Sequence, residues 1–136
     1  MVTLDEVAEW VAELPGVTDG SSYGNHTWNV GGTHFAWERP FRKADLKRFG
    51  DAPVPTGPIV ALRVEDLGEK EAVLAEGRRG VFTIPHFDGY PAVLVQLDRV
   101  GRRVFRDLLT DAWLACAPDA LAREHLEALR RGDPAP

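Results

Sequence analysis

The sequence predicts an α+β fold: a two-layer sandwich in which helices cover one face of an antiparallel five-stranded sheet. Three observations support this prediction. Segments with helical periodicity open and close the chain, short apolar runs of strand character lie between them, and turn signals join neighbouring runs into hairpins. Strands joined by hairpins pair antiparallel and need amphipathic helices to cover their apolar face. The expected order is α-β-β-β-α-β-β-α, with a further helix at the end.

The first helix begins at a capping box, because the hydroxyl residue Thr3 is followed three positions later by Glu6. Apolar residues then recur at helical spacing, at Leu4, Val7, Ala8, Val11 and Leu14. Pro15-Gly16 ends the helix. The glycines and serines of residues 20–24 indicate a loop.

Two strands follow, at residues 26–30 and 33–38, and Gly31-Gly32 joins them as a two-residue hairpin turn. Their alternation predicts that Trp28 and Val30 share one face, and that Phe35 and Trp37 also share a face. Residues 39–57 are rich in proline and glycine, so we expect irregular structure with a short helical turn at residues 44–49.

The apolar residues 58–64 predict a third, central strand, and residues 65–76 return to a helical pattern that stops at Gly77. Residues 81–84 and 92–97 predict the last two strands, joined as a hairpin. The Asp88-Gly89 turn between them would present His86, Asp88 and Tyr90 to solvent.

One apolar stripe predicts the longest helix, formed by Val104, Phe105, Leu108, Leu109, Ala112, Trp113 and Cys116. Pro118 ends it, and a further helix is expected at residues 119–131. Residues 132–136 should form a frayed tail. The length of 136 residues predicts one domain, spanning residues 1–131.

The composition predicts a cytoplasmic protein. The chain holds 44% hydrophobic and 27% charged residues, in the ordinary soluble range, and no apolar run is long enough to span a bilayer. The acidic N-terminus lacks the basic region of a secretory signal. The single cysteine, Cys116, excludes an internal disulfide and a cysteine-based metal cluster.

Several phrases of the sequence resemble the MmcQ/YjbR-like family of small bacterial proteins. The main one is the hairpin segment Phe-Thr-Ile-Pro-His-Phe-Asp-Gly-Tyr-Pro-Ala-Val-Leu-Val at residues 82–95. Others lie at residues 14–17, 23–24, 30–36, 108–113 and 117–118, so the resemblance covers residues 3–122. It implies the family's α+β fold and a DNA-binding function. The basic, proline-rich stretch before the third strand is longer than in many members.

A basic cluster supports the nucleic-acid hypothesis. Between residues 39 and 48 one acid, Asp45, accompanies five cations that would contact phosphates without sequence preference: Arg39, Arg42, Lys43, Lys47 and Arg48. Phe41, Phe49 and Trp37 lie nearby and would stack on unpaired bases. The net charge of −5 argues against this hypothesis. In the alternative interpretation, the cations form a solvated face and pair with acids of the same chain.

A second hypothesis is a binding module for a small planar ligand or a protein partner. Large aromatic and histidine side chains could line a cleft with apolar walls and few polar anchors. The candidates are His26, Trp28, His86, Asp88 and Tyr90. A protein partner would instead dock on the sheet face, an inference from fold analogy.

The sequence predicts neither an enzyme nor a metal or cofactor. Ser21 and Ser22 lack a nucleophile-elbow motif, and Cys116 falls on the apolar stripe of a helix, where thiols are inert. Phosphate-loop and dinucleotide-binding motifs are absent from the sequence. The histidines at 26, 34 and 86, with Asp88, match no standard metal-ligand spacing.

Overall fold

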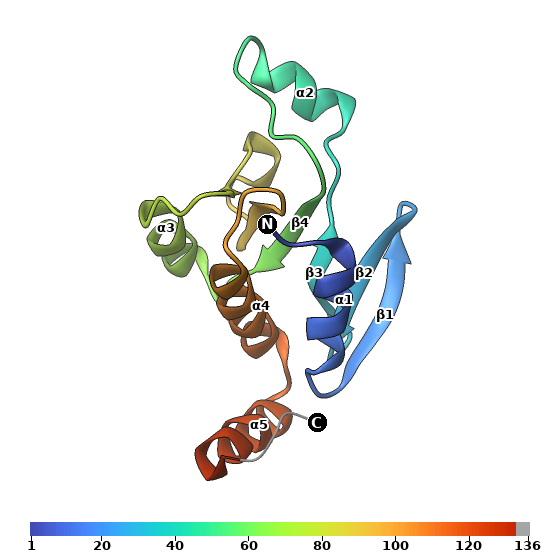
Figure 1. Cartoon of the computed structure of the whole chain (residues 1–136), viewed down its shortest axis with the longest axis vertical. Coiled ribbons are helices and arrows are strands. Elements are labelled where there is room, and N and C mark those ends of the chain that lie inside the picture. Colours follow the sequence, from blue (N-terminus) through green and yellow to red (C-terminus); the bar gives the residue numbers. More distant parts are fainter. Residues whose placement is uncertain (133–136) are drawn as a thin grey trace.

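The computed structural model describes residues 1–132, which form a six-stranded antiparallel sheet and five α-helices (Figure 1). The α+β class and the antiparallel sheet are confirmed. The strands lie in the order β1-β2-β3-β4-β6-β5. The elements are α1 (Leu4–Ala12), β1 (Val17–Ser22), β2 (Asn25–Val30), β3 (Thr33–Glu38), α2 (Lys43–Phe49), β4 (Ile59–Arg63), α3 (Leu67–Ala75), β5 (Val81–Phe82), a 3-10 turn η1 (Pro85–Phe87), β6 (Ala92–Gln96), α4 (Arg102–Cys116) and α5 (Asp119–Arg131). Residues 133–136 of the predicted tail lie outside the described residues.

The prediction of five strands was wrong because β1 was expected to be a loop. Its glycine and serines are poor strand formers, yet β1 pairs with β2 along its whole length, from Val17 opposite Val30 to Ser22 opposite Asn25. Only Tyr23 and Gly24 remain in the turn, with φ of 51° and 78°. Two central residues with positive φ suit the right-handed twist of a hairpin. The pairing therefore overrides the weak local preference.

The prediction that Phe35 and Trp37 share a face was also wrong, because the β2–β3 ladder contains a bulge. Trp28 pairs with Ala36, but the next residue, Asn29, pairs with His34. The extra residue, Phe35, is unpaired and joins Ala36 in the core cluster that also contains Trp28. A bulge shifts the alternation by one residue. Trp37 consequently packs against the cluster on the other side of the sheet.

Both faces of the central strands are buried. On β4, Val60 and Leu62 belong to the larger core cluster, whereas Ile59 and Ala61 belong to a smaller one. Helices α1 and α4 cover the larger cluster (Figure 1). The smaller cluster consists of Ile59, Ala61, Ile84, Phe87, Ala92 and Leu94, with Trp37, Phe41, Phe49 and Phe82 packed against it. Because Phe49 belongs to α2, the helices are not confined to one face as predicted.

The expected hairpin at residues 81–97 is present, but its loop is more ordered than a simple turn. Strands β5 and β6 pair through Val81 with Val95 and Phe82 with Leu94. The loop contains η1, and Phe87 is buried. The buried Lys70 of α3 donates hydrogen bonds to the carbonyl oxygens of Phe87 (2.6 Å) and Tyr90 (2.8 Å). This lysine therefore holds the loop to α3.

None of the helices within residues 1–132 has both the length and the apolar character required to cross a membrane.

Candidate functional site

Arg39 is buried, although the sequence suggested a surface phosphate contact. It follows β3, its side chain is 5% exposed, and its Nη1 lies 3.0 Å from Oδ2 of Asp45, whose side chain is 2% exposed. Nη1 also donates to the carbonyl of Pro40. Asp45 accepts a second hydrogen bond, at 2.8 Å, from the backbone amide of Arg42. Arg39 therefore cannot contact the backbone of a duplex on the surface.

The environment of Asp45 favours its ionised form. Burial by itself raises the pKa of this carboxyl, but the Arg42 amide and the Arg39 guanidinium together outweigh that effect, and His86 adds a smaller one. The net result holds the pKa of Asp45 below its usual value. Arg39 and Asp45 thus form a buried, charged pair that links the end of β3 to α2.

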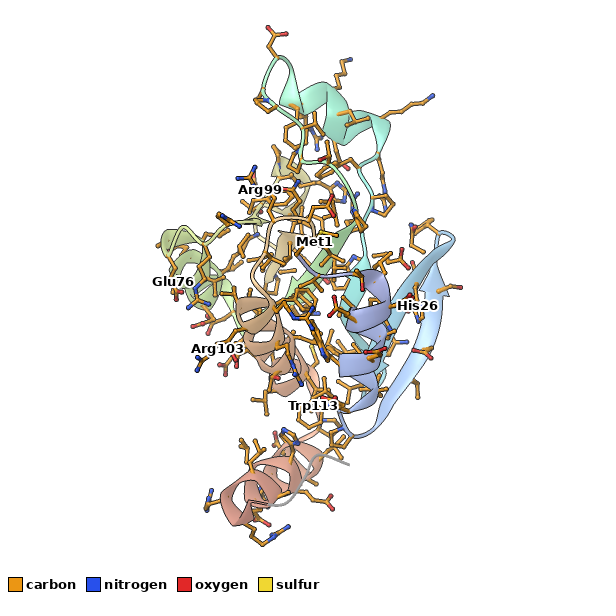
Figure 2. The ribbon with its side chains drawn as sticks, viewed as in Figure 1. Met1, His26, Glu76, Arg99, Arg103 and Trp113 are labelled. Carbon is orange, nitrogen blue, oxygen red and sulfur yellow. The ribbon has the colours of Figure 1, made fainter. Side chains whose placement is uncertain are left out.

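The other four predicted cations are exposed at the beginning of α2 and along it: Arg42, Lys43, Lys47 and Arg48. Helix α2 lies at one end of the molecule, and side chains extend outward from it (Figure 2). The guanidinium carbon of Arg42 lies 5.5 Å from the ring centroid of Tyr23, at the tip of the β1–β2 hairpin. Phe41 and Phe49 are in ring contact with each other and pack on the smaller core cluster, so they are not free to stack on bases.

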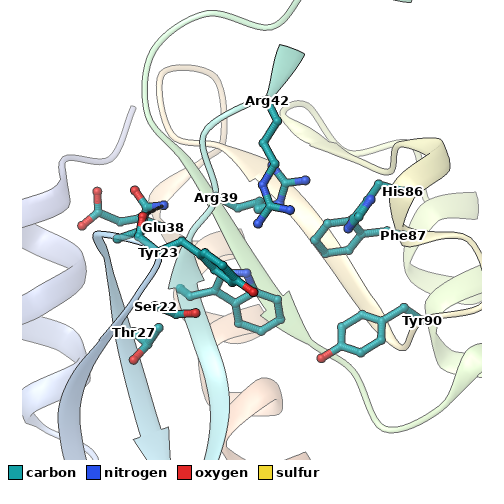
Figure 3. Close-up of a pocket in the computed structure, with 11 residues that line it drawn as sticks. Ser22, Tyr23, Thr27, Glu38, Arg39, Arg42, His86, Phe87 and Tyr90 are labelled. Carbon is teal, nitrogen blue, oxygen red and sulfur yellow. Dashed lines mark hydrogen bonds between the residues drawn. The ribbon is translucent and has the colours of Figure 1, made fainter. Parts of the chain in front are cut away.

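A cavity of about 260 Å³ opens between the β1–β2 tip, the end of β3 and the η1 loop (Figure 3). Aromatic rings form much of its wall. Trp37 and Phe87 lie nearly parallel with centroids 6.4 Å apart, and Tyr90 meets both rings edge-on. The cavity is lined by Ser22, Tyr23, Asn25, Thr27, Trp37, Glu38, Arg39, Arg42, His86, Phe87 and Tyr90.

Two buried polar atoms of this lining have no hydrogen-bond partner within residues 1–132. They are Nη2 of Arg39 and Oγ1 of Thr27, on residues that are 4% and 1% exposed. Buried polar groups in folded proteins are nearly always paired, so an unpaired one requires an explanation. Of the described side chains, the only other with such an atom is Arg63, which does not line this cavity.

The five residues predicted to share a cleft lie at different places. His86 and Tyr90 line the cavity, and Asp88 is exposed beside it without lining it. His26 and Trp28 stack on each other, with centroids 4.5 Å apart, and Trp28 belongs to the core cluster under the helices. His26 also contacts Asp19 at 3.2 Å. The predicted cleft is therefore divided between the two faces of the sheet.

Sequence reasoning missed the contribution of Trp37, Arg39 and Thr27 to the cavity. Thr27 precedes Trp28, so strand alternation alone could have assigned it to the face opposite that tryptophan. The bulge that turns Trp37 to the same face as Thr27 leaves no recognisable signal in the sequence. Nor does the sequence reveal that Arg39 is buried, since its acidic partner lies six positions away on another element.

The described residues offer little further chemistry. Within residues 1–132 there is no group of three or more His, Cys, Asp or Glu side chains that could hold a metal ion. Burial raises the pKa of the Cys116 thiol, and the guanidinium of Arg63 offsets this only in part. A raised pKa lowers the thiolate fraction on which nucleophilic reactivity depends.

Comparison with known proteins identifies relatives of this chain. The family model described as YjbR matches residues 12–115. Uncharacterized proteins of Mycobacterium bovis and of two strains of Mycobacterium tuberculosis are each 46% identical over 129 residues, covering 93% of this chain and 97% of the relative. No solved structure gives a significant match.

Proposed function

Since the chain belongs to the YjbR family, we propose that it is a non-enzymatic module that binds nucleic acid through phosphate contacts from α2. The contacts would come from the exposed side chains of Arg42, Lys43, Lys47 and Arg48, which we call the α2 cation surface. The resemblance to a family labelled DNA-binding supports the proposal. The geometry of α2 is the independent argument.

The inward orientation of Asp45 is the observation on which this proposal rests. Asp45 is the one acidic residue of α2, and it is buried against Arg39. Within residues 1–132, Lys43, Lys47 and Arg48 form no ion pair with any carboxylate. The outer surface of α2 therefore keeps its positive charge in a chain whose net charge is −5. Unneutralised cations are what a phosphate backbone recognises.

The acidic residues of the chain are concentrated elsewhere. Helix α1 carries Asp5 and Glu6 in its first turn and Glu9 farther along, and Glu6 and Glu13 are paired with arginines of α4. This segregation lets a local positive surface exist on an acidic protein. Because α2 has only seven residues and its cations would contact phosphates, we expect weak binding without sequence preference.

The test is fluorescence anisotropy of a labelled DNA duplex and a labelled single strand, titrated with the protein across a salt series. Four phosphate contacts predict a slope of about −4 for log K against log salt. Replacing Lys43, Lys47 and Arg48 by Ala should reduce the slope to about −1.

The matched control changes Arg79, Arg123 and Arg130 to Ala. These three arginines are also exposed, but they lie outside α2. Both triple variants make the same change in net charge, so only contacts localised on α2 can separate them. An equal loss of affinity in the two triple variants would show that binding depends on the overall charge and not on contacts from α2. Absence of binding at 50 mM salt would refute the proposal.

A further inference from the structure

We propose that the cavity beside α2 is a binding site for a small planar organic anion, an aromatic ring carrying a carboxylate. The ring would lie against Trp37, Phe87 and Tyr90, and the carboxylate would accept hydrogen bonds from Arg39 and Thr27. This site lies on the sheet face opposite the His26–Trp28 pair, and nothing in its argument depends on nucleic-acid binding.

The guanidinium of Arg39 is the principal anchor. Its Nη1 is fully used, by Asp45 at 3.0 Å and by the carbonyl of Pro40 at 2.6 Å. Its Nη2 is buried and has no partner within residues 1–132, and Arg39 is one of the residues that line the cavity. Leaving a buried charged donor unpaired is unfavourable, and an anion in the cavity would satisfy it. Asp45 holds the guanidinium in place through Nη1.

The hydroxyl of Thr27 is the second anchor. Thr27 is 1% exposed, lies on the same face as Trp37, and has an unpartnered Oγ1. A hydroxyl can donate to a carboxylate or to another oxygen acceptor. With Nη2 of Arg39, this hydroxyl is the second polar atom on a lining residue that has no partner within residues 1–132.

The charge at the rim favours a negative ligand. Arg42 and His86 both line the cavity, and Figure 3 shows their side chains on the same side as Arg39. Glu38 is the one acidic residue of the lining, and it extends away from the aromatic rings in the same view. Asp45 pairs with Arg39 through Nη1, so Arg39 contributes a free N–H donor, and the net positive charge of the lining comes from Arg42. Arginine donors such as the buried Arg39 and the exposed Arg42 recognise carboxylates by charge-assisted hydrogen bonds.

The size and walls of the cavity favour a single or fused aromatic ring. Its volume of about 260 Å³ is just below the range of about 300–1,000 Å³ that ligand pockets usually have. The flat faces of Trp37 and Phe87 lie at 20° to each other, and Tyr90 stands edge-on to both. Offset and edge-on contacts between such rings are the favoured arrangements. A larger ligand, such as a dinucleotide, would not be enclosed.

The experiment compares 2-naphthoate with 2-naphthamide by isothermal titration calorimetry and by thermal unfolding. The two probes share the ring system and differ in the charged group. We expect the acid to bind about tenfold more tightly than the amide and to raise the Tm accordingly. Equal binding of acid and amide, or no binding of either, would overturn the proposal. Thymidine monophosphate is a third probe, and binding of the nucleotide alone would show a phosphate site and overturn the assignment to carboxylates.

Two substitutions test the anchors. Arg39→Lys keeps a cation for Asp45 and removes Nη2, so the affinity for 2-naphthoate should fall about tenfold. Thr27→Val should weaken binding about fivefold without lowering the Tm of the free protein, because it removes an unpaired buried hydroxyl. A merely structural threonine would show the opposite result, a lower Tm with unchanged affinity.

Thr18→Val is the matched control, because Thr18 is also a strand threonine but is exposed on β1 and does not line the cavity. It should leave the affinity unchanged. If Arg39→Lys fails to fold, Thr27→Val still decides the question. Tyr90→Ala, at a residue already 41% exposed, tests the wall and should reduce the affinity for acid and amide alike. Unchanged affinity in both Thr27→Val and Tyr90→Ala would refute the site.

Discussion

Breaking the buried pair between Arg39 and Asp45 is the most informative perturbation of this fold. The pair joins the end of β3 to α2, and both side chains are at least 95% buried, with exposed fractions of 5% and 2%. Asp45 also accepts the backbone amide of Arg42 at 2.8 Å, which fixes the beginning of α2. Asp45→Ala therefore removes the ion pair and the helix cap together.

The expected cost of Asp45→Ala follows from these two losses. Removing one partner of a buried ion pair leaves the other charge uncompensated, at about 3–5 kcal/mol. The loss of the cap adds about 1 kcal/mol. The total approaches the whole stability of a marginal domain, typically about 5–15 kcal/mol. The double variant Arg39→Met with Asp45→Leu leaves no buried charge, so we expect it to be more stable than Asp45→Ala by about 3 kcal/mol.

Urea unfolding at pH 7, followed by tryptophan fluorescence, measures both free energies of unfolding. A double-mutant cycle over the parent, Arg39→Met, Asp45→Leu and the double variant gives the coupling between the two positions. We expect unchanged m-values, and we expect the double variant to lose much less stability than the sum of the losses in the two single variants. This expectation is wrong if Asp45→Ala lies within 1 kcal/mol of the parent, because the pair would then be neither buried nor responsible for holding α2.

The same pair predicts how stability depends on acidity. The folded-state pKa of Asp45 is lowered from its ordinary value of 3.8, so the unfolded state binds its proton first as the pH falls. The stabilisation by Asp45 is therefore fully present above about pH 5 and is lost as the pH drops below 4 toward the lowered pKa. The double variant Arg39→Met with Asp45→Leu has neither charge, so its stability should lack this part of the pH dependence.

Three further predictions concern other residues. Gly80→Ala should lower the free energy of unfolding in urea by at least about 2 kcal/mol more than Gly89→Ala does. Both glycines have positive φ, so the backbone strain is similar. A Cβ at Gly80 would lie 2.8 Å from the Val100 amide, whereas no atom lies within 4 Å of a Cβ at Gly89. Similar costs would contradict the packing around Gly80. Burial lowers the pKa of Lys70, so between that lowered pKa and 10.5 the unfolded state binds more protons, and stability should rise with pH across this interval. Lys70→Met should flatten the rise, and a rise that is unchanged or steeper would contradict the prediction. Because its pKa is raised, Cys116 should react with a disulfide reagent at least tenfold more slowly in the native protein than after unfolding, and equal rates would contradict its burial.

The sequence predicts the apolar elements well. The stripe on α4 and the apolar runs of β4 and β6 follow from periodicity, because burial on the helix face or on both faces of the sheet is recorded in every residue. Strand β1 could not be predicted in this way. Its residues Asp19, Gly20 and Ser21 are exposed, and its pairing depends on β2 alone. An edge strand with little buried surface leaves almost no pattern to detect.

The candidate site was less predictable than the fold, because its composition depends on a shift of strand register by a single residue. The bulge at Phe35 turns Trp37 to the opposite face, and a shift of one residue reverses every assignment that follows. His86 and Tyr90 were identified from the loop, since turn chemistry exposes their side chains whatever the register of β3. The other key residues of the cavity, Trp37, Arg39 and Thr27, come from β3, the end of β3 and β2, and the sequence does not specify the register of these strands.

The orientation of Asp45 connects the two candidate surfaces physically. Because its carboxylate points inward to Arg39, the α2 cation surface is not neutralised, and Asp45 pairs with Nη1 of that arginine while Nη2 has no partner within residues 1–132. If Asp45 pointed outward, it would reduce the charge of α2 and would leave Arg39 without the partner that holds it. A substitution of Asp45 should therefore affect nucleic-acid binding and anion binding together, whereas Lys47→Ala and Thr27→Val should each affect only one. Measuring both ligands on these three variants separates a shared structural cause from two independent sites.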